Sequence, residues 1–507
     1  MPDYIYMLES RLSAEQRAVL LRMQELAVET STNVYLTGGA VRDVISGMPI
    51  RDLDFTVEGN PSRFARELEK NGARVVHEDE KLRHVELIFS GDVDGSVAAA
   101  REEIYARPEA RPETRWSTIM EDLRRRDFSL NAVAISLNAA SRGLLLDPTN
   151  GLADLESREV RALSIHSFSN QPVRLLRAIR YAARMEFKLE PRTEEWFKLA
   201  LERGKREAIS PAEAGSELRQ VAREDKPVQI LKAWEARDLL EPISPQLAKR
   251  HPHYEMLARI LRARDDLSAA GIRTRFFAPV TFAVLGRLKD RELSSALNHV
   301  EFRAQEIEAV ATVEDRASKI TAALAGHKTA SPGDAYAFLE KAPGDLLAFI
   351  LAESSNSKAV GKIRTYLTKW KPLRQALPAA VLELETIGME HGPKFDQVIE
   401  NLFQAQLAGK ARNPELRIKL LRKLSGIKEA PKKKVEEKKK PEKSSKRKPG
   451  VPAPSAPVQP GRVEQPAADA LARLKAARKG KASPAPPPAA SAAKPAQKPK
   501  AAASRKR

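Results

Sequence analysis

Residues 38–54 combine glycines and aspartates in a pattern that suits phosphate chemistry. Gly38 and Gly39 follow an apolar, strand-like run, so the backbone there can approach a phosphate closely, and a helix that begins there offers free N–H groups. Asp52 and Asp54 are two residues apart in a β-rich segment, which places both carboxylates on one side of a strand. A carboxylate pair beside a phosphate cradle is what two Mg²⁺ ions need for in-line nucleotidyl transfer. We therefore predict that Asp52 and Asp54 are catalytic metal ligands.

Several basic residues are positioned to bind the anionic part of such a substrate. Arg42 lies in the first turn of the expected helix, where its guanidinium can grip a triphosphate oxygen. Arg126 and Asp127 can hydrogen-bond a phosphate and a 2′-hydroxyl, respectively. One further set of arginines recurs at helical spacing and forms a basic stripe: Arg174, Arg177, Arg180 and Arg184.

The elements that must position these residues predict an α+β protein. A helix is expected over 13–30, because Ser13 and Gln16 form a capping-box pattern ahead of an apolar face. A short helix is expected from Ala40. The strand signals are apolar or alternating runs at 34–39, 53–57, 84–89 and 132–137. From about residue 166 onward the pattern is helical throughout, so a small head with a mixed sheet is followed by an all-α region.

The predicted division of the chain has five parts. They are an N-terminal helix (1–32), a head (33–165), a helical neck (166–240), a helical body and tail (241–430), and a disordered tail rich in Lys, Pro and Ala (431–507). The last segment contains 14 of the 34 prolines and no aromatic residue. Such a composition cannot bury enough apolar surface to become ordered by itself.

The bulk composition limits the class of protein. The formal net charge is +20, but residues 431–507 hold 22 of the 87 Lys and Arg and 5 of the 67 Asp and Glu, so the rest of the chain carries only +3. The charge therefore says little about the folded part. With no cysteine in the chain, disulfides and Cys-ligated metals are excluded and a cytoplasmic protein is expected. No apolar run approaches the length of a membrane span or a signal peptide.

The segment from Gly38 to Asp54 resembles motif A of class II tRNA nucleotidyltransferases, the CCA-adding family, which also includes bacterial poly(A) polymerases. Four further segments resemble motifs B to E in the family's order: Arg124–Ala132, Asp147–Leu155, Arg174–Arg184 and Ser210–Glu217. The resemblance implies a nucleotidyltransferase head and a neck that reads the nucleotide base and binds RNA. The residues expected to bind the nucleotide are then Gly38, Gly39, Arg42, Arg126, Asp127, Gln171, Arg174, Arg177 and Arg180.

The sequence departs from the family pattern in three places. The family's base-reading Asp is Gln171 here, next to the retained Arg174. An amide both donates and accepts, so Gln171 is expected to flip and to discriminate less sharply between bases than a carboxylate. A further family Asp is Ser96, and Asp94 on the same strand face is a possible substitute. In motif E, the usual Glu-Arg pair reads Ala212-Glu213, and only Glu217 is retained.

The resulting hypothesis is template-independent addition of nucleotides to RNA 3′ ends with Mg²⁺. CCA addition to tRNA from CTP and ATP is the first choice, because the segment with Tyr105, Pro108 and Pro112 resembles the flexible loop of CCA-adding enzymes. A poly(A) polymerase or an A-only-adding enzyme is the alternative, favoured by Gln171. A non-catalytic RNA-binding relative is the second alternative. The expected partners are RNA, ATP and CTP, with no membrane; the sequence does not indicate an oligomeric state.

Overall fold

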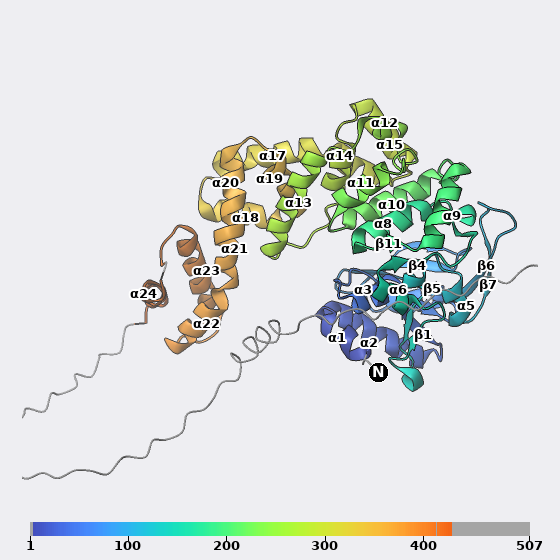
Figure 1. Ribbon diagram of the computed structural model, residues 1–507. Coiled ribbons are helices and arrows are strands. Elements are labelled where there is room, and N and C mark those ends of the chain that lie inside the picture. Colours follow the sequence, from blue (N-terminus) through green and yellow to red (C-terminus); the bar gives the residue numbers. More distant parts are fainter. Residues whose placement is uncertain (1–3, 412, 428–507) are drawn as a thin grey trace, which may run out of the picture. The chain divides into compact units, whose positions relative to one another are not determined.

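The structure, a computed structural model, describes residues 4–411 and 413–427 (Figure 1). The predicted disordered tail, 431–507, lies outside the described residues. Within the described part, no helix is long and apolar enough to cross a membrane.

A seven-stranded sheet forms the centre of the head. In spatial order its strands are β3 (Arg74–Asp79), β4 (His84–Phe89), β5 (Val93–Ala99), β2 (Leu53–Val57), β1 (Val34–Thr37), β8 (Ala134–Ser136) and β9 (Leu145–Leu146). All neighbours are antiparallel except β2 and β5, which are parallel. Parallel strands need a long crossover, and here the connection contains α4 (Pro61–Glu69), β3 and β4. The predicted mixed sheet is confirmed.

The strands that the sequence predicted correctly are those with apolar side chains. β2 and β4 have the expected bounds, whereas β1 ends before the glycines and β8 is confined to 134–136. β3, β5 and the two-residue β9 were not predicted. The side chains of β3 are largely exposed at the sheet edge, and β5 contains Asp94, Gly95 and Ser96, which have low strand propensity. β5 forms because β2 and β4 hydrogen-bond to it on both sides.

The two faces of the sheet have different partners. Val34 and Leu36 of β1 point into a core that α1 (Tyr4–Arg11), α2 (Ala14–Glu29), α3 (Gly39–Ser46) and α4 cover. Tyr35, between them, points to the opposite face and packs with Ile119 and Leu123 of α5 (Ile119–Arg124). This alternation follows from the period of two in a strand. It leaves the α5 face of β1, β2 and β5 free to carry polar side chains.

The expected N-terminal helix is α2, and its cap is the one predicted. Ser13 accepts from the Gln16 backbone, and the Gln16 side chain accepts from Ser13. Leu8 of α1 joins the same core as α2 and the sheet. The remaining small elements of the head are the hairpin β6 (Arg101–Ile104) and β7 (Glu113–Trp116), the 3₁₀ turns Ser129–Asn131 and Ala139–Ser141, and α6 (Gly151–Ser157).

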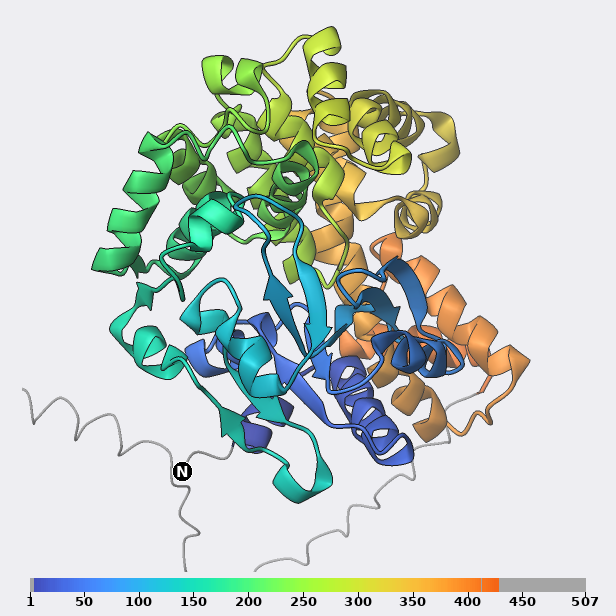
Figure 2. The same ribbon diagram turned by 90° about the vertical axis from the view of Figure 1, so that its right-hand side faces the viewer.

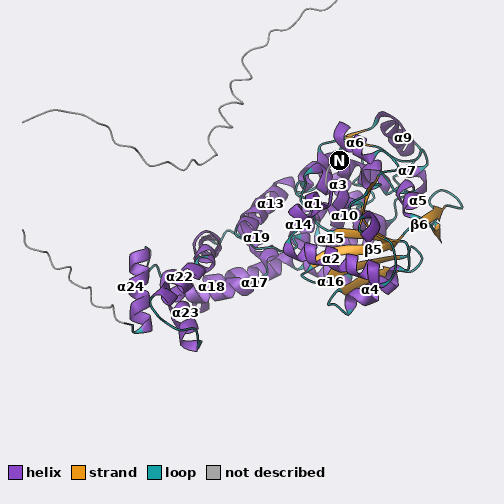
Figure 3. Ribbon diagram, turned by 90° about the horizontal axis from the view of Figure 1, so that it is seen from below, coloured by secondary structure: helices purple, strands orange, loops and turns teal. Residues whose placement is uncertain are grey.

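From residue 167 the described chain is helical apart from the pairing of β11 (Lys188–Leu189) with β10 (Glu159–Val160). This two-residue strand was not expected. Figures 2 and 3 show that the strands gather in the head, while the green-to-orange part of the chain consists of helices. Proline occupies the first turn of many of these helices, where its missing N–H is not needed. They are α7 (Ser167–Asn170), α8 (Arg174–Met185), α9 (Pro191–Glu202), α10 (Pro211–Arg223), α11 (Pro227–Glu235), α12 (Pro245–Arg250), α13 (Tyr254–Ala269), α14 (Phe277–Leu285), α15 (Asp290–His299), α16 (Ala304–Ala311), α17 (Val313–Ala325), α18 (Pro332–Lys341), α19 (Gly344–Glu353), α20 (Ser357–Thr365), the π-helical turn Tyr366–Trp370, α21 (Lys371–Gln375), α22 (Leu377–Thr386), α23 (Pro393–Leu407) and α24 (Pro414–Ser425).

Head and neck share a hydrophobic core. Phe128 and Leu130, which follow the motif B arginines, belong to the same cluster as Leu175 and Ile179 of α8 and the buried Trp234 of α11. Phe128 also packs edge-on against Tyr181, with ring centroids 5.9 Å apart. Motif B is therefore fixed by apolar contacts with the neck as well as by the head.

Truncation after Ala430 is expected to leave the melting temperature unchanged within about 1 °C. The removed segment has no aromatic residue to bury, and a composition of this kind contributes little to a hydrophobic core. Thermal unfolding of the full chain and of residues 1–430 tests this expectation. A loss of several degrees would show that the tail packs on the rest of the chain.

Candidate active site

The candidate catalytic carboxylates lie on the free face of the sheet. Leu53, Phe55 and Val57 of β2 point into the core beneath it, so the side chains of Asp54 and Thr56 point the other way. Asp52 immediately precedes the strand. Both aspartates line a cavity of about 790 Å³ between the sheet and the neck. The alternation predicted from the sequence is thus present, and the core on the opposite face holds it in register.

The glycine turn ends β1 beside these carboxylates. Gly38 has φ of +68° and caps the N-terminus of α3, a conformation that favours glycine. A Cβ on Gly39 would lie 3.5 Å from the Arg42 guanidinium and 4.0 Å from an Asp52 oxygen. Both glycines line the cavity, so α3 directs its first backbone N–H groups to the space beside Asp52.

Arg42 is more enclosed than its expected role suggests. Only 2% of the residue is exposed, and its guanidinium donates to Asp43 (Nε to Oδ1, 2.9 Å) and to Asn131 (Nη1 to Oδ1, 2.7 Å). It also lies 5.0 Å from the centre of the Tyr181 ring. These contacts link α3, motif B and the neck helix, and Arg42 still borders the cavity. These partners would hold the Arg42 guanidinium in place when it also contacts a phosphate.

Arg126 and Asp127 belong to two different sets of contacts. Arg126 donates to Asp122 (Nη2 to Oδ2, 2.9 Å) and to Thr56 (Nη2 to Oγ1, 3.0 Å), which anchors it to the head. Asp127 accepts from the neck residue Arg177 (Nη1 to Oδ2, 3.0 Å). Burial by itself would raise the pKa of Asp127, but Arg177 and Arg174 outweigh it and lower the pKa to about 2. Asp127 is therefore ionised at neutral pH.

The predicted basic stripe on α8 is largely neutralised by buried carboxylates. Glu217 of α10 accepts from both Arg177 (Oε1, 2.8 Å) and Arg180 (Oε2, 2.8 Å). Arg180 also donates to Glu224 at 3.1 Å, and Arg184 donates to Asp43 at 2.7 Å. Glu217 and Glu224 are buried. The retained motif E glutamate thus fixes the stripe to the next neck helix, and Glu213 closes the capping box of α10 with Ser210.

Gln171 and Arg174 enter the same cavity from the neck. Arg174 is buried and donates to Ser167 (Nη1 to Oγ, 2.8 Å), and its Nε has no partner in the described structure. Gln171 donates through Nε2 to the hydroxyl of Tyr105. The predicted phosphate-side and base-side residues therefore all line one cavity, namely Gly38, Gly39, Arg42, Asp52, Asp54, Arg126, Asp127, Gln171, Arg174, Arg177 and Arg180.

The two aspartates repel one another in their ionised forms. Burial and the charge of Asp52 raise the pKa of Asp54 to about 6, although the Ser96 hydroxyl donates to it (Oγ to Oδ1, 2.7 Å). A bound cation would relieve this repulsion.

Ser96, and not Asp94, is hydrogen-bonded to the candidate catalytic pair. The parallel register of β2 and β5 places Ser96 directly opposite Asp54. Asp94 lies on the same face of β5 but does not line the cavity, because Arg223 (3.0 Å) and Arg275 (2.6 Å) bind its carboxylate. Arg223 also approaches Asp52, with 3.9 Å between Nη2 and Oδ2. Asp94 therefore does not take the place of the family aspartate.

The donor set fits a hard divalent cation that is completed by a substrate. In the described residues, no three His, Cys, Asp or Glu side chains are grouped so that they alone would hold a metal. Mg²⁺, however, is commonly bound by one or two carboxylates together with substrate phosphates and water. Asp52 and Asp54, beside the α3 N-terminus, offer two carboxylates next to a place for phosphates.

Several residues of the site were not predicted. Thr56 and Asn131 orient Arg126 and Arg42, and Glu103 and Tyr105 line the cavity from the hairpin. Asn131 stands in the motif B segment that had been recognised. The alternation along β6 also places Glu103 on the same face as Arg101. That this face turns to the cavity depends on the packing of the hairpin, which no local pattern specifies.

Asp54→Asn is expected to raise the melting temperature of the metal-free protein by a few degrees at pH 7. The folded pKa of about 6 lies above the ordinary aspartate value of 3.8, so ionisation of Asp54 disfavours the folded state. The stabilising contribution of the protonated form is present below about pH 4 and is lost as the pH rises through 6. The gain should thus grow between pH 4.5 and 7 in thermal unfolding with a chelator. An equal gain at both pH values would contradict this explanation.

Glu217→Gln is expected to destabilise the fold by about 3–5 kcal/mol, because it leaves the buried Arg180 and the partly buried Arg177 with less compensating charge. Glu306→Gln is the matched control. Glu306 also accepts two hydrogen bonds from one arginine, Arg219, both at 2.9 Å, but this pair is more exposed, so a loss of about 1 kcal/mol is expected. Urea unfolding of both variants measures the difference. Equal losses would show that Glu217 is not a central support of the neck.

Comparison with known proteins shows what this chain is similar to. Residues 34–161 match the family described as the poly A polymerase head domain. The chain is 26% identical over 424 residues to an A-adding tRNA nucleotidyltransferase of Geobacter sulfurreducens, which covers 82% of this chain and 48% of that protein. It is 38% identical over 209 residues to an A-adding tRNA nucleotidyltransferase of Aquifex aeolicus, which covers 41% of this chain and 25% of that protein. The chain thus spans about half, or less, of the length of these curated relatives.

A solved structure of a CCA-adding enzyme in an apo form is similar over 82% of this chain and 98% of its own, with 26% identity and a TM-score of 0.46. The order of the motifs, the head domain match and the similarity to these relatives agree with one another. The chain is thus similar to tRNA nucleotidyltransferases, and its residues 34–161 match the poly A polymerase head domain.

Proposed function

We propose that this protein adds nucleotides to RNA 3′ ends without a nucleic-acid template. Its first substrate would be tRNA, to which it adds CCA or part of it from CTP and ATP. The observation that carries this proposal is one cavity with two carboxylates on its sheet side and Gln171 and Arg174 on its neck side. Such a cavity holds the triphosphate at one end and the base at the other.

In the proposed reaction, the RNA 3′-hydroxyl oxygen attacks the α-phosphorus of the nucleotide and pyrophosphate leaves. Asp52 and Asp54 would hold Mg²⁺, which neutralises charge on the attacking and leaving oxygens. The N–H groups at the start of α3, together with Arg42 and Arg126, bind the triphosphate. Asp127, ionised and fixed by Arg177, accepts from a ribose hydroxyl. Gln171 and Arg174 contact the base edge.

This proposal assigns a role to each part of the chain. The head (33–165) carries out the transfer, with the N-terminal helix (1–32) supporting it, and the neck (166–240) reads the base. The body and tail (241–430) extend the surface for RNA, and the Lys-rich segment 431–507 adds affinity for phosphates. We propose the cytoplasm as the site of this reaction.

A-only addition is the second candidate, because two relatives of this chain are named A-adding tRNA nucleotidyltransferases. A panel of acceptors separates the possibilities. Purified protein is incubated with tRNA that lacks its 3′ CCA, with tRNA that ends in CC, and with generic RNA, and each nucleoside triphosphate is offered separately. C incorporation on the first acceptor indicates CCA or CC addition. A single A on the second alone indicates A-only addition, and long A tracts on generic RNA indicate a poly(A) polymerase.

Asp52→Ala and Asp54→Ala are each expected to reduce incorporation at least about a thousandfold, since metal-ion charge stabilisation contributes several kcal/mol. Asp265→Ala in α13, outside the cavity, is the control and should be unaffected. In addition, Mg²⁺ should raise the melting temperature of the wild type but not of Asp54→Ala. Near-normal turnover in either variant would contradict the metal assignment. No incorporation by the wild type on any acceptor would favour a non-catalytic RNA-binding relative.

A further inference from the structure

The side chain of Gln171 is tethered to the head. Its amide nitrogen donates to the hydroxyl of Tyr105, which follows strand β6 and comes 66 residues earlier in the chain. The Tyr105 hydroxyl in turn donates to Glu103 (Oη to Oε2, 2.8 Å). Gln171, Tyr105 and Glu103 all line the cavity. A base-side residue of the neck is therefore hydrogen-bonded, through one tyrosine, to a carboxylate of the β6–β7 hairpin.

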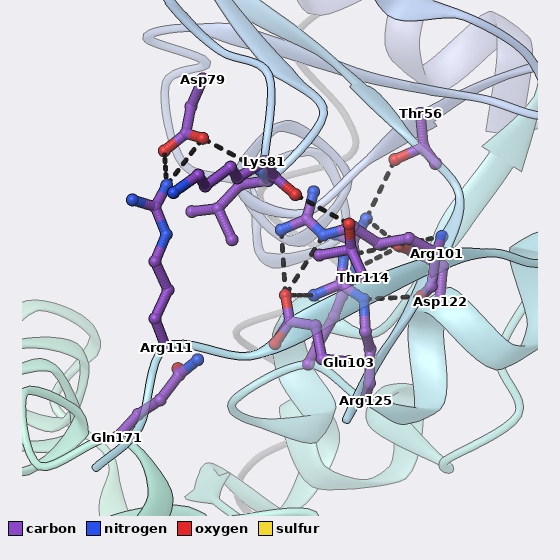
Figure 4. A network of polar contacts seen from close by, with 12 residues as sticks. Thr56, Asp79, Lys81, Arg101, Glu103, Arg111, Thr114, Asp122, Arg125 and Gln171 are labelled. Atoms are coloured by element: carbon purple, nitrogen blue, oxygen red, sulfur yellow. Dashed lines mark hydrogen bonds and ion pairs between the residues drawn. The ribbon is translucent and has the colours of Figure 1, made fainter. Parts of the chain in front are cut away.

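Glu103 is held as an anion. Arg101 (Nη2, 3.0 Å) and Arg125 (Nη1, 2.8 Å) both donate to its Oε1, and Figure 4 shows these two arginines directed at the Glu103 carboxylate. Only 5% of its side chain is exposed. Burial alone would raise the pKa of Glu103, but Arg125 and Arg101 lower it below its ordinary value. The carboxylate is thus ionised at neutral pH and can only accept hydrogen bonds.

The directions of the two tyrosine hydrogen bonds follow from this charge. Tyr105 has one hydroxyl hydrogen, and the Glu103 carboxylate takes it because it has no hydrogen to give. The hydroxyl oxygen then has only lone pairs left to offer Gln171. The group of Gln171 that faces Tyr105 must therefore be the amide NH₂, which uses one of its two N–H groups and fixes the carbonyl oxygen as the acceptor offered to a ligand. A flipped amide would set two acceptors against each other and lose the hydrogen bond.

We propose that Tyr105 and Glu103 are positioning residues that fix the Gln171 amide, so that Gln171 presents its carbonyl oxygen to the incoming base as an acceptor, as a carboxylate would. This inference rests on the proposed function of the same cavity. Beside the donor Arg174, a fixed acceptor matches the edges of cytosine and adenine, each of which has an exocyclic amine next to a ring nitrogen that accepts. Guanine and uracil present a carbonyl oxygen next to a ring N–H, and both contacts would be mismatched.

The tether changes what is expected of Gln171. An amide that rotates freely can both donate and accept hydrogen bonds. It would therefore discriminate between bases less sharply than the family's aspartate. With its amide fixed by Tyr105, the wild-type protein should exclude GTP and UTP, and Gln171→Asp by itself should improve selectivity little. Discrimination would then depend on a hydroxyl that does not itself contact the base.

Tyr105→Phe tests the proposal, because it keeps the ring and removes only the hydroxyl. The selectivity, taken as kcat/KM for ATP and CTP over that for GTP and UTP, should fall about tenfold, which corresponds to one neutral hydrogen bond. Equilibrium Kd values for ATP and GTP, measured without RNA, should show the same loss. In the double variant Gln171→Asp/Tyr105→Phe the selectivity should be restored, since a carboxylate accepts in either orientation.

Tyr254→Phe is the matched control. The Tyr254 hydroxyl also donates to a glutamate, Glu235, but neither residue lines the cavity, so selectivity should not change. Three outcomes would overturn the inference and leave the proposed function intact: an active wild type that uses all four nucleotides equally, a Tyr105→Phe variant as selective as wild type, or a double variant as unselective as Tyr105→Phe. A wild type that transfers no nucleotide overturns the proposed function instead, and the Kd ratio for ATP and GTP then decides the role of Tyr105.

Discussion

The buried pairing of Glu217 with Arg177 and Arg180 is the constraint on which the candidate site depends. The Arg180 guanidinium and the Glu217 carboxylate are buried, and the Arg177 side chain is 30% exposed. Buried charges of this kind are tolerated only when each has a partner. Arg177 completes its contacts with Asp127 of the head. The same set of charges thus fixes the neck helix α8, its neighbour α10 and motif B relative to one another.

This network explains why a conspicuous row of arginines is less available for ligands than its sequence spacing suggests. Arg180 and Arg184 neutralise Glu224 and Asp43, and Arg42 neutralises Asp43 from the other side. The free positive potential of the cavity is therefore smaller than the number of arginines implies. What the arginines provide instead is rigidity: the groups that face the substrate are held by partners that are themselves buried, which is how a site keeps its geometry before the substrate arrives.

The carboxylates of Asp52 and Asp54 differ from these arginines, because their neighbours do not fully compensate their negative charge. Asp52 and Asp54 repel each other, and the Ser96 hydroxyl and the charges of Arg126 and Arg223 offset this repulsion only in part. Arg223 is also shared with Asp94. A protein that retains two repelling carboxylates at a cavity loses stability there. The loss is understandable if a cation and a triphosphate occupy the place during function, because both would be bound by groups that are already in position.

The sequence by itself determined the elements whose signals are local. The apolar alternation of 53–57 and 84–89 gave β2 and β4 their bounds, Ser13 and Gln16 gave the cap of α2, and the two glycines gave the start of α3. It also placed Asp52 and Asp54 on one face, since a strand has a period of two whatever surrounds it. Only the tertiary structure decided the strands that depend on neighbours, such as β5, and the partners of long charged side chains. No local pattern indicates that Glu217 joins two arginines, that Asp94 is bound by Arg223 and Arg275, or that Tyr105 reaches Gln171, because each contact joins elements far apart in the chain whose approach is set by the packing of the shared core.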